Sequence, residues 1–149
     1  FPDLNEGRRH PAKYDRRHDL ALVGTYDLNK RWSFSGVFIY GTGNTTTLPE
    51  TFYFMEGTLI QGYGDINSYR MEAYHRLDLS AIYTPTPRKP NRRIKSSWAF
   101  SVYNVYSRKN PYFIYFDQDG SAADATLKVS AKQVSLFPII PSVTYNFRF

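Results

Sequence analysis

Few residues in this chain have the type and spacing that chemistry requires. His10, His18 and His75 lie far apart without a carboxylate cluster at ligand spacing, which favours loop hydrogen bonding over a metal site. The segment 117–124 holds three aspartates and Gly120, but it lacks the terminal glutamate and alternating ligands of an EF-hand. The chain has no Gly-x-Ser-x-Gly motif and no phosphate-binding loop. We therefore expect a protein that binds without catalysis, metal or cofactor.

The best candidates for ligand contact are aromatic residues and one arginine in a long loop, 41–74. Rings combined with a guanidinium suit sugars, siderophores or peptides alike. Packing of the loop against neighbouring loops or a surface partner explains the same residues at least as well. The candidates for substrate contact are Phe52, Tyr53, Phe54, Tyr63, Tyr69 and Arg70.

Strands must position these residues, because a two-residue period of apolar and polar side chains runs through much of the chain. Each periodic stretch is about nine residues long, close to the 9 to 11 residues of a tilted transmembrane strand. Aromatic residues gather at the ends of these stretches, as in the girdles of membrane barrels. The predicted strands are 20–28, 32–40, 76–84, 97–106 and 142–149.

The last predicted strand carries the clearest alternation. Its apolar face needs apolar surroundings up to its final residue, whereas most chains end in a frayed polar tail. A lipid bilayer is one such environment. The residues on this face are Val143, Tyr145, Phe147 and Phe149, and they alternate with Ser142, Thr144, Asn146 and Arg148.

Four polar residues are assigned by parity to the opposite face of the sheet, which would line a lumen. They are Arg76, Asp78, Asn146 and Arg148. An arginine facing lipid near the middle of a membrane would cost roughly 2–4 kcal/mol, so this assignment avoids a large penalty. Arg76 and Asp78 could contact a plug or a passing substrate, although an ion pair that braces the wall is favoured.

The composition of the chain is compatible with membrane-spanning strands, but it does not decide between a membrane protein and a soluble one. Aromatic residues make up 17% of the chain, cysteine is absent, and mean hydropathy is −0.50. No stretch provides the roughly 20 apolar residues of a transmembrane helix, whereas barrel strands are only half apolar. Much of the net charge of +6 lies in two connections, 8–17 and 88–95. Solvated loop charge is favoured there over nucleic-acid binding, and 8–17 could also meet lipopolysaccharide phosphates.

The connections alternate in length, as in outer-membrane barrels. Residues 29–31 form a tight turn, and 41–74 is too long for an ordinary hairpin. The fourth strand is expected to continue through 110–116, turn at 117–120 and return along 126–137. If the chain ends in the periplasm, the loop 41–74 is extracellular. The connection 85–95 is then a long periplasmic turn with three prolines.

Five strands cannot close a barrel, and open edges in hydrocarbon cost several kcal/mol for each unpaired group. We therefore expect either a fragment, which is favoured, or a chain that pairs with another chain.

Six blocks of sequence carry a family resemblance that spans nearly the whole chain. The Tyr-His-Arg-Leu-Asp-Leu and Asn-Val-Tyr-Ser-Arg-Lys-Asn-Pro blocks are specific when they occur in this order before a terminal Phe. The blocks are 14–20, 29–34, 40–44, 69–79, 103–111 and 133–149, and they resemble the C-terminal strands of TonB-dependent outer-membrane receptors.

This resemblance implies an all-β fold, with residues 1–149 forming about five C-terminal strands of a 22-stranded antiparallel transmembrane barrel. It implies active import of a scarce nutrient such as a siderophore, glycan, peptide or cofactor across the outer membrane of a Gram-negative bacterium. The implied partners are the rest of the barrel and its plug, TonB acting through absent regions, the barrel assembly machinery, and outer-membrane lipids and lipopolysaccharide. A surface lipoprotein as a further partner stays open. The terminal aromatic strand would be the assembly signal.

Two other functions remain open on the sequence. The first is a structural or adhesive outer-membrane barrel whose loops recruit surface partners without transport. The second is a soluble aromatic-rich β-sandwich that binds glycans, which predicts solubility without detergent. The apolar face of the terminal strand argues against a soluble β-sandwich.

Overall fold

The computed structural model describes residues 5–56, 58–86, 95–120 and 128–149. The chain divides into two compact units, which we call the loop unit (1–19 and 41–74) and the sheet unit (20–40 and 75–149). The fold is all-β, apart from a short 3-10 turn at Asn5–Gly7, and its sheets are antiparallel. No helix in these described ranges is long and apolar enough to span a membrane.

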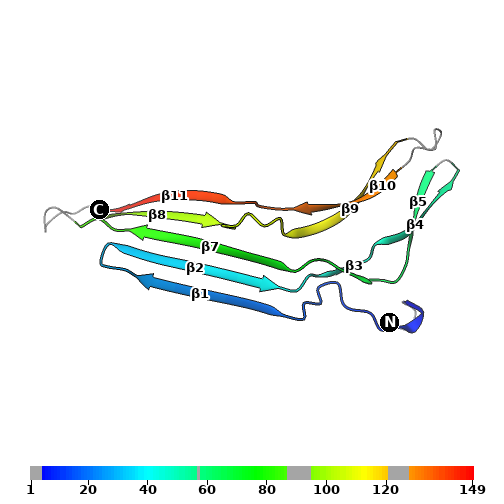
Figure 1. Cartoon of the computed structure of the whole chain (residues 1–149), viewed down its shortest axis with the longest axis horizontal. Coiled ribbons are helices and arrows are strands. Elements are labelled where there is room, and N and C mark those ends of the chain that lie inside the picture. Colours follow the sequence, from blue (N-terminus) through cyan, green and yellow to red (C-terminus); the bar gives the residue numbers. More distant parts are fainter. Residues whose placement is uncertain (1–4, 57, 87–94, 121–127) are drawn as a thin grey trace. The chain divides into compact units, whose positions relative to one another are not determined.

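The sheet unit is built on a five-stranded sheet with the order β1-β2-β7-β8-β11 (Figure 1). This confirms the five predicted strands, since each one overlaps a strand of this sheet. The strands are β1 (Asp19–Asp27), β2 (Trp32–Gly41), β7 (Tyr74–Tyr83), β8 (Lys95–Tyr103) and β11 (Ile140–Arg148). The tight turn predicted at 29–31 is also present, between β1 and β2.

Side-chain parity divides the sheet into two faces. Ala81, Phe100 and Val143 lie opposite one another on β7, β8 and β11 and belong to the apolar face. Ser80, Ser101 and Ser142 form the next row and belong to the polar face. The register therefore keeps the hydrophobic side chains of neighbouring strands on the same face, as the two-residue period predicted.

Among the described residues of the sheet unit, no second layer covers the apolar face. None of the hydrophobic side chains in the described part of the chain is buried, and the exposed large ones include Trp98 and Phe100 on β8 and Val143, Tyr145 and Phe147 on β11. Phe100 is 41% exposed, Val143 62% and Phe147 64%. A water-soluble domain would bury such a face against another sheet or a helix.

The fourth predicted strand needs two corrections. It ends at Tyr103 rather than continuing, because Asn104 adopts a left-handed conformation with φ of 53°. The predicted pairing of 110–116 with the returning stretch 126–137 is confirmed as a separate hairpin of β9 (Pro111–Asp119) and β10 (Lys128–Ser135). The turn predicted at 117–120 is wrong, since Asp117 and Asp119 are strand residues paired with Ser130 and Lys128. The polar Asp-Gln-Asp sequence suggested a turn, but cross-strand pairing continues through it.

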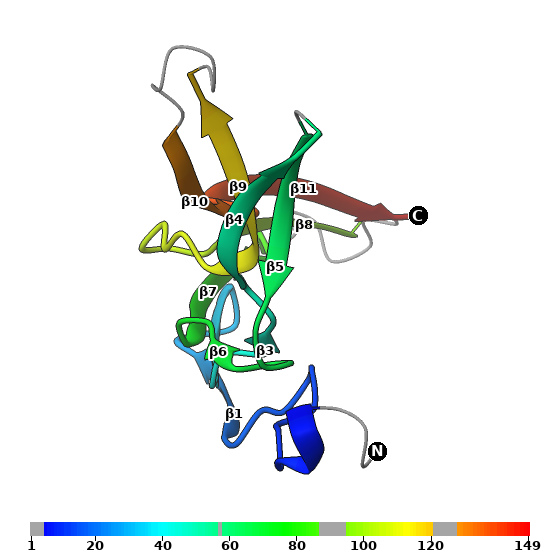
Figure 2. The same ribbon diagram turned by 90° about the vertical axis from the view of Figure 1, so that its right-hand side faces the viewer.

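The loop unit contains two small antiparallel pairs. The predicted loop 41–74 is therefore structured in large part, and its β4–β5 hairpin forms a distinct two-stranded ribbon (Figure 2). The pairs are β3 (Thr45–Thr46) with β6 (Tyr69–Arg70), and β4 (Pro49–Met55) with β5 (Thr58–Tyr63). Most of the predicted periplasmic turn 85–95 lies outside the described residues.

Candidate functional site

The sheet has two chemically different ends. The turn end is where the 29–31 turn lies and where β7 finishes, and the asparagine end is where β8 finishes before Asn104. At the turn end, the Asn29 side-chain oxygen accepts hydrogen bonds from the backbone N–H groups of Arg31 (2.8 Å) and Trp32 (3.0 Å). The Thr84 N–H donates to the Arg31 carbonyl at 2.7 Å, which ties the turn to the end of β7.

Aromatic rings cross the apolar face at the turn end. The ring centroids of Trp32 and Tyr83 are 4.8 Å apart, and those of Trp98 and Tyr145 are 4.7 Å apart. Stacking continues along β11 from Tyr145 to Phe147 at 6.1 Å. Such pairs contribute about 0.5–1.5 kcal/mol each beyond the area that they bury. The rings at this end therefore form two groups, and the ladder places Tyr83 of the first group opposite Trp98 of the second.

The proposed assembly-signal residues all project from the apolar face. Val143, Tyr145, Phe147 and Phe149 are between 48% and 92% exposed, although the rings contact one another. Their partners on β8 are apolar at Phe100 and Trp98. β11 therefore presents a row of exposed apolar side chains along the edge of the sheet.

At the asparagine end, two asparagines replace the hydrophobic contacts of an ordinary core. Asn104 is 1% exposed and Asn110 is 5% exposed. The Asn104 amide donates to the carbonyls of Arg108 (2.9 Å) and Phe137 (3.1 Å), while its oxygen accepts from the Arg108 N–H (3.1 Å). These bonds hold the segment 104–110 in a fixed shape.

Asn110 joins the same segment to β7. Its side-chain oxygen accepts from the His75 N–H at 3.0 Å, and its amide donates to the His75 carbonyl at 2.9 Å. The side chain thus makes both backbone bonds that a neighbouring strand would make. The His75 ring also lies within hydrogen-bond distance of the Tyr106 hydroxyl, at 2.8 Å.

Arg76 and Asp78 form the ion pair that was expected as a brace. Both Nε and Nη2 of Arg76 lie 3.0 Å from Asp78 Oδ2, and Nη1 donates to the Tyr103 hydroxyl. Asp78 Oδ1 accepts from the Asn104 N–H at 2.9 Å. The side chains of Arg76 and Asp78 are 18% and 24% exposed. Through the bond from Asp78 to Asn104, this ion pair connects the polar face of the sheet to the buried asparagines.

The other two polar-face candidates lie at the turn end. Asn146 is opposite Ser97 on β8, and Arg148 is opposite Lys95. Both are exposed. The structure therefore separates the four predicted lumen residues into two groups at opposite ends of the sheet.

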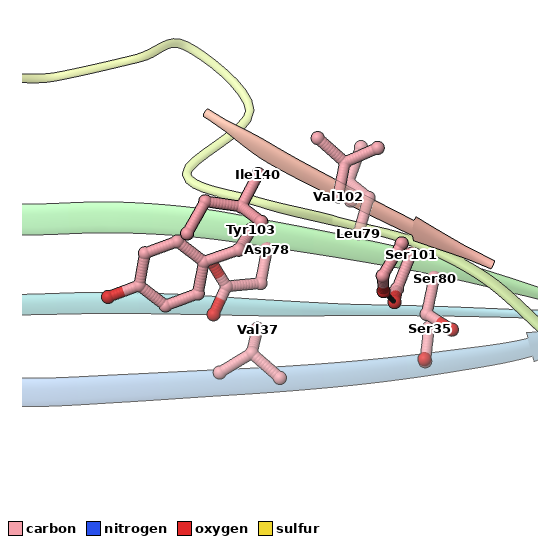
Figure 3. A pocket seen from close by; sticks show the side chains of 10 residues that line it. Ser35, Val37, Asp78, Leu79, Ser80, Ser101, Val102, Tyr103 and Ile140 are labelled. Carbon is pink, nitrogen blue, oxygen red and sulfur yellow. Dashed lines mark hydrogen bonds between the residues drawn. The ribbon is translucent and has the colours of Figure 1, made fainter. Parts of the chain in front are cut away.

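A shallow hollow of about 430 Å³ lies between these groups on the polar face (Figure 3). Ser101 lies opposite both Ser80 and Ser142 in the ladder, and its hydroxyl is 2.7 Å from that of Ser142. These serine hydroxyls can both donate and accept hydrogen bonds, which suits contact with a polar protein segment or a polar solute. Polar-face residues lining the hollow are Ser35, Val37, Asp78, Ser80, Ser101, Tyr103, Ile140 and Ser142.

In the loop unit, Arg70 makes hydrogen bonds and an ion pair to other residues of the same unit. Its Nη1 donates to the carbonyls of Asp15 (2.6 Å) and Gly43 (2.8 Å), and its Nη2 pairs with the Asp15 carboxylate at 2.6 Å. A Cβ added at Gly43 would lie 1.8 Å from the Met71 carbonyl oxygen. Gly43 therefore lies tightly against the backbone at Met71, and Arg70 links this region to Asp15, 55 residues away in the sequence.

The pre-strand segment belongs to this unit through further polar contacts. The Asn5 side-chain oxygen accepts from the Ile66 N–H at 2.7 Å, and Arg8 donates to Asp65 at 3.0 Å. The Asn67 amide donates to the Pro11 carbonyl at 2.9 Å. These contacts use part of the basic segment internally, and they give the loop unit a defined shape.

The aromatic ligand candidates do not form one cluster. In the β4–β5 ladder, Phe52 and Phe54 alternate with Tyr53, so Tyr53 lies on the opposite face of the hairpin. Tyr63 donates its hydroxyl to Gln61 at 2.8 Å, while Tyr69 lies on β6. Tyr53, Phe54 and Tyr63 are at least half exposed. The hairpin offers two separate aromatic surfaces.

Two titratable groups outside the five-stranded sheet have a raised pKa. Burial raises the pKa of the Tyr106 hydroxyl, with Asp78 adding to the increase and Arg108 and Arg76 opposing it. A hydrogen bond to Asp117 raises the pKa of Lys132 on the β9–β10 hairpin. In the described part of the chain, no three acidic or histidine side chains gather as a metal site would require.

Sequence reasoning missed the residues that organise the asparagine end. The sequence placed Asn104 inside the predicted strand 97–106, and Asn110 at the start of its continuation through 110–116. The signal that could have found Asn104 is an asparagine that interrupts a two-residue period, since asparagine tolerates positive φ. Asn110 directly precedes Pro111, where a strand would begin without a backbone N–H donor.

Comparison with protein-family profiles, with curated proteins and with solved structures finds no match to this chain. The resemblance to TonB-dependent receptors therefore stays a hypothesis.

Proposed function

We propose that this chain forms part of the wall and external loops of a β-barrel in the outer membrane of a Gram-negative bacterium. We further propose that the barrel is a TonB-dependent transporter that imports a scarce nutrient. The observation that carries the proposal is the uncovered apolar face of the five-stranded sheet. The transport step depends on the family resemblance.

The exposed face has an energetic consequence. Hydrophobic side chains stabilise a fold by about 25 cal/mol for each Å² of apolar surface removed from water. On the described part of the sheet, the apolar side chains of one face stay exposed. Serines and the Arg76–Asp78 pair occupy the other face. Hydrocarbon on the first side and water or polar protein on the second would satisfy both faces.

The spacing of the rings supports a membrane of ordinary thickness. Tyr83 and His75 lie eight residues apart on β7, at opposite ends of the apolar face. At about 3.4 Å per residue and a tilt near 40°, this corresponds to about 21 Å along the membrane normal. The apolar band of outer-membrane barrels is about 25 Å tall. The two ring levels thus lie where the girdles of such a barrel would be.

The edges of the sheet indicate that further strands are needed. β1 and β11 are the two edge strands. In hydrocarbon each edge must pair, because water is not available to bond its backbone groups. In the proposed barrel, the remaining strands of a 22-stranded wall provide these partners, with a plug on the polar side.

Within this proposal, the loop unit gathers the nutrient from outside. The exposed rings of Tyr53, Phe54 and Tyr63 remain the candidates for first contact, and Phe52 and Tyr69 remain candidates on β4 and β6. Arg70 acts by holding the loop in shape through Asp15 and Gly43. Its replacement should therefore weaken uptake through loop structure.

The test is uptake by cells that carry the complete natural gene. Haem, ferric siderophores, oligosaccharides and peptides are offered as scarce nutrients, in cells with and without TonB. We expect the protein in the outer-membrane fraction and one nutrient whose uptake disappears when TonB is deleted. An outer-membrane protein whose deletion changes no uptake would instead support the adhesive barrel, and a protein soluble without detergent would exclude both.

A further inference from the structure

The β4–β5 hairpin exposes apolar side chains on both of its faces. Tyr53, Phe54 and Met55 follow one another on β4, and each is at least half exposed. Successive residues of a strand point to opposite faces, so Phe54 lies on one face and its two neighbours lie on the other. Tyr63 of β5, which is also exposed, shares its face with Leu59, the ladder partner of Phe54. Both faces of the ribbon are therefore open to a ligand.

The β4 strand is also an edge strand. Its partner among the described strands is β5, and the two form a separate two-stranded sheet (Figure 2). An extended peptide can add to such an edge through main-chain hydrogen bonds, and its alternating side chains then contact both faces of the ribbon. A sugar ring or a flat ligand would instead stack on one face. The exposed side chains on both faces therefore favour a peptide strand.

The charge of the hairpin indicates that this peptide is basic. Residues 41–69 include no lysine, arginine or histidine, although the whole chain has 19 lysines and arginines. The acids of this stretch are Glu50, Glu56 and Asp65. Asp65 pairs with Arg8 at 3.0 Å, whereas the two glutamates are exposed and form no ion pair with the described side chains. The hairpin thus offers negative charge to a ligand and no cation to a carboxylate or phosphate.

The two glutamates lie near opposite ends of β4. Glu50 is the second residue of the strand, and its carboxylate fills the space that a side chain at Gly64 would need. Glu56 directly follows the last residue of the strand. At about 3.4 Å per residue, the six steps between them correspond to about 20 Å. A strand added to β4 would therefore meet one acid near each end, with the exposed apolar residues between them.

The β9–β10 hairpin has a different charge pattern. It also exposes two neighbouring rings, Tyr112 and Phe113. However, its Asp117 is paired with Lys132, and Lys128 lies on the same strand as that lysine. This hairpin therefore has cations of its own in the ladder, whereas the β4–β5 hairpin has none. Exposed rings combined with uncompensated acids are specific to the β4–β5 hairpin among the two described ribbons.

We infer that the edge of β4 binds a short extended peptide with an apolar centre and a lysine or arginine near each end. This inference deepens the proposed function by naming the nutrient class, and it rests on that proposal for the position of the loop unit outside the cell. Binding itself requires no transport. Main-chain hydrogen bonds align the peptide, and the two glutamates select its charge.

The first experiment measures the binding of defined peptides to the full-length protein in detergent. The probe is the capped peptide Lys-Val-Thr-Val-Thr-Val-Lys with a neutral fluorescent label, and anisotropy reports its binding. Its lysines have the same spacing as Glu50 and Glu56. A matched peptide carries glutamate in place of both lysines. We expect the lysine peptide to bind about tenfold more tightly, with a preference that decreases as salt is added.

A second pair of probes tests whether the peptide adds as a strand. N-methylation of alternate residues removes the hydrogen-bond donors from one edge of an extended peptide. An added strand uses only one of its edges. Methylation of one alternate set should therefore abolish binding, and methylation of the other set should retain it. This comparison uses the wild-type protein, so its outcome does not depend on the folding of a variant.

A charge variant tests the two glutamates. Glu50→Gln with Glu56→Gln should weaken binding of the lysine peptide about fivefold to tenfold, because each exposed ion pair contributes modestly. Asp27→Asn with Asp119→Asn is the matched control, since it removes the same charge from positions outside the hairpin. The control should bind the lysine peptide as the wild type does.

A ring variant tests the exposed side chains of β4. Tyr53→Thr with Phe54→Thr removes one ring from each face and keeps a residue that favours strands. We expect binding of the lysine peptide about tenfold weaker. Tyr112→Thr with Phe113→Thr removes the corresponding pair from the β9–β10 hairpin, and it should leave binding unchanged.

Three results would overturn the inference. They are equal binding of the lysine and glutamate peptides, full binding of both methylated peptides, and equal losses for the ring variants of the two hairpins. TonB-dependent uptake of another nutrient without peptide binding would also overturn it and would leave the proposed function intact. Peptide binding without TonB-dependent uptake would support the inference and contradict the proposed transport.

Discussion

The two ends of the sheet satisfy their polar and apolar groups in opposite ways. At the asparagine end, Asn104, Asn110 and Asp78 bond to backbone and side chains of the same chain. At the turn end, Trp98 and Tyr145 keep much of their surface exposed, and Lys95 faces Arg148. The first end is stabilised by internal contacts, whereas the second leaves its aromatic rings exposed and two positive charges opposite each other.

This difference indicates where the environment matters. Substitutions at the asparagine end should destabilise the protein in any medium, because they break internal bonds. Substitutions at the turn end should have effects that depend on the lipid. The predictions that follow apply to the full-length protein, with unfolding followed in urea by tryptophan fluorescence in detergent and in vesicles.

The largest effect is expected at Asn104. An Asn104→Ala substitution removes its side-chain bonds to Arg108 and Phe137 and places alanine at positive φ. We expect a loss of about 3 kcal/mol in unfolding free energy, of similar size in both media. Asn146→Ala is the matched control on an exposed strand position, with a change within about 0.5 kcal/mol. Equal losses at both sites would show that the asparagine end is not specially organised.

A smaller effect is expected at Asp78. The Asp78→Asn substitution retains an acceptor for the Asn104 N–H but removes the charge that pairs with Arg76. We expect a loss of about 1–2 kcal/mol. Asp27→Asn at the turn end, where no ion pair is described for that aspartate, should change stability by less than about 0.5 kcal/mol. A larger loss for Asp27→Asn would reverse the proposed contrast between the ends.

The smallest effect is expected at Trp98, and its dependence on the medium is what matters. Trp98→Ala removes the ring contact with Tyr145, for a loss of about 1 kcal/mol that should differ between vesicles and detergent. Tyr115 on the β9–β10 hairpin has nearly the same exposure, 42% against 40%, so Tyr115→Ala is the matched control. Its effect should be the same in both media. Identical behaviour of the two variants would argue against a girdle at the turn end.

The sequence predicted the local parts of this fold well. A two-residue period is a local signal, and it identified the strands of the main sheet and the turn at 29–31. Contacts between distant residues left no such signal. Arg70 pairs with Asp15, which is 55 residues away, and its selection as a ligand contact could not take that partner into account.

The asparagine end shows the same limit. The bend at Asn104 depends on bonds to Arg108 and Phe137, so the fourth strand was extended past its true end. The turn assigned to 117–120 failed because strand pairing with β10 overrode the turn preference of aspartate and glycine. The brace between Arg76 and Asp78 was anticipated, because both residues share a face only two positions apart.

The most direct test of the central claim compares arginine at two adjacent positions of β7. Leu79 lies midway between the two ring levels on the apolar face, and Ser80 lies on the polar face beside the hollow. In vesicles, Leu79→Arg should lower the unfolding free energy by about 2–4 kcal/mol more than Ser80→Arg, with Leu79→Ala measuring the loss of leucine alone. Equal costs at the two positions, or a larger cost at Ser80, would contradict a sheet that faces lipid on its apolar side.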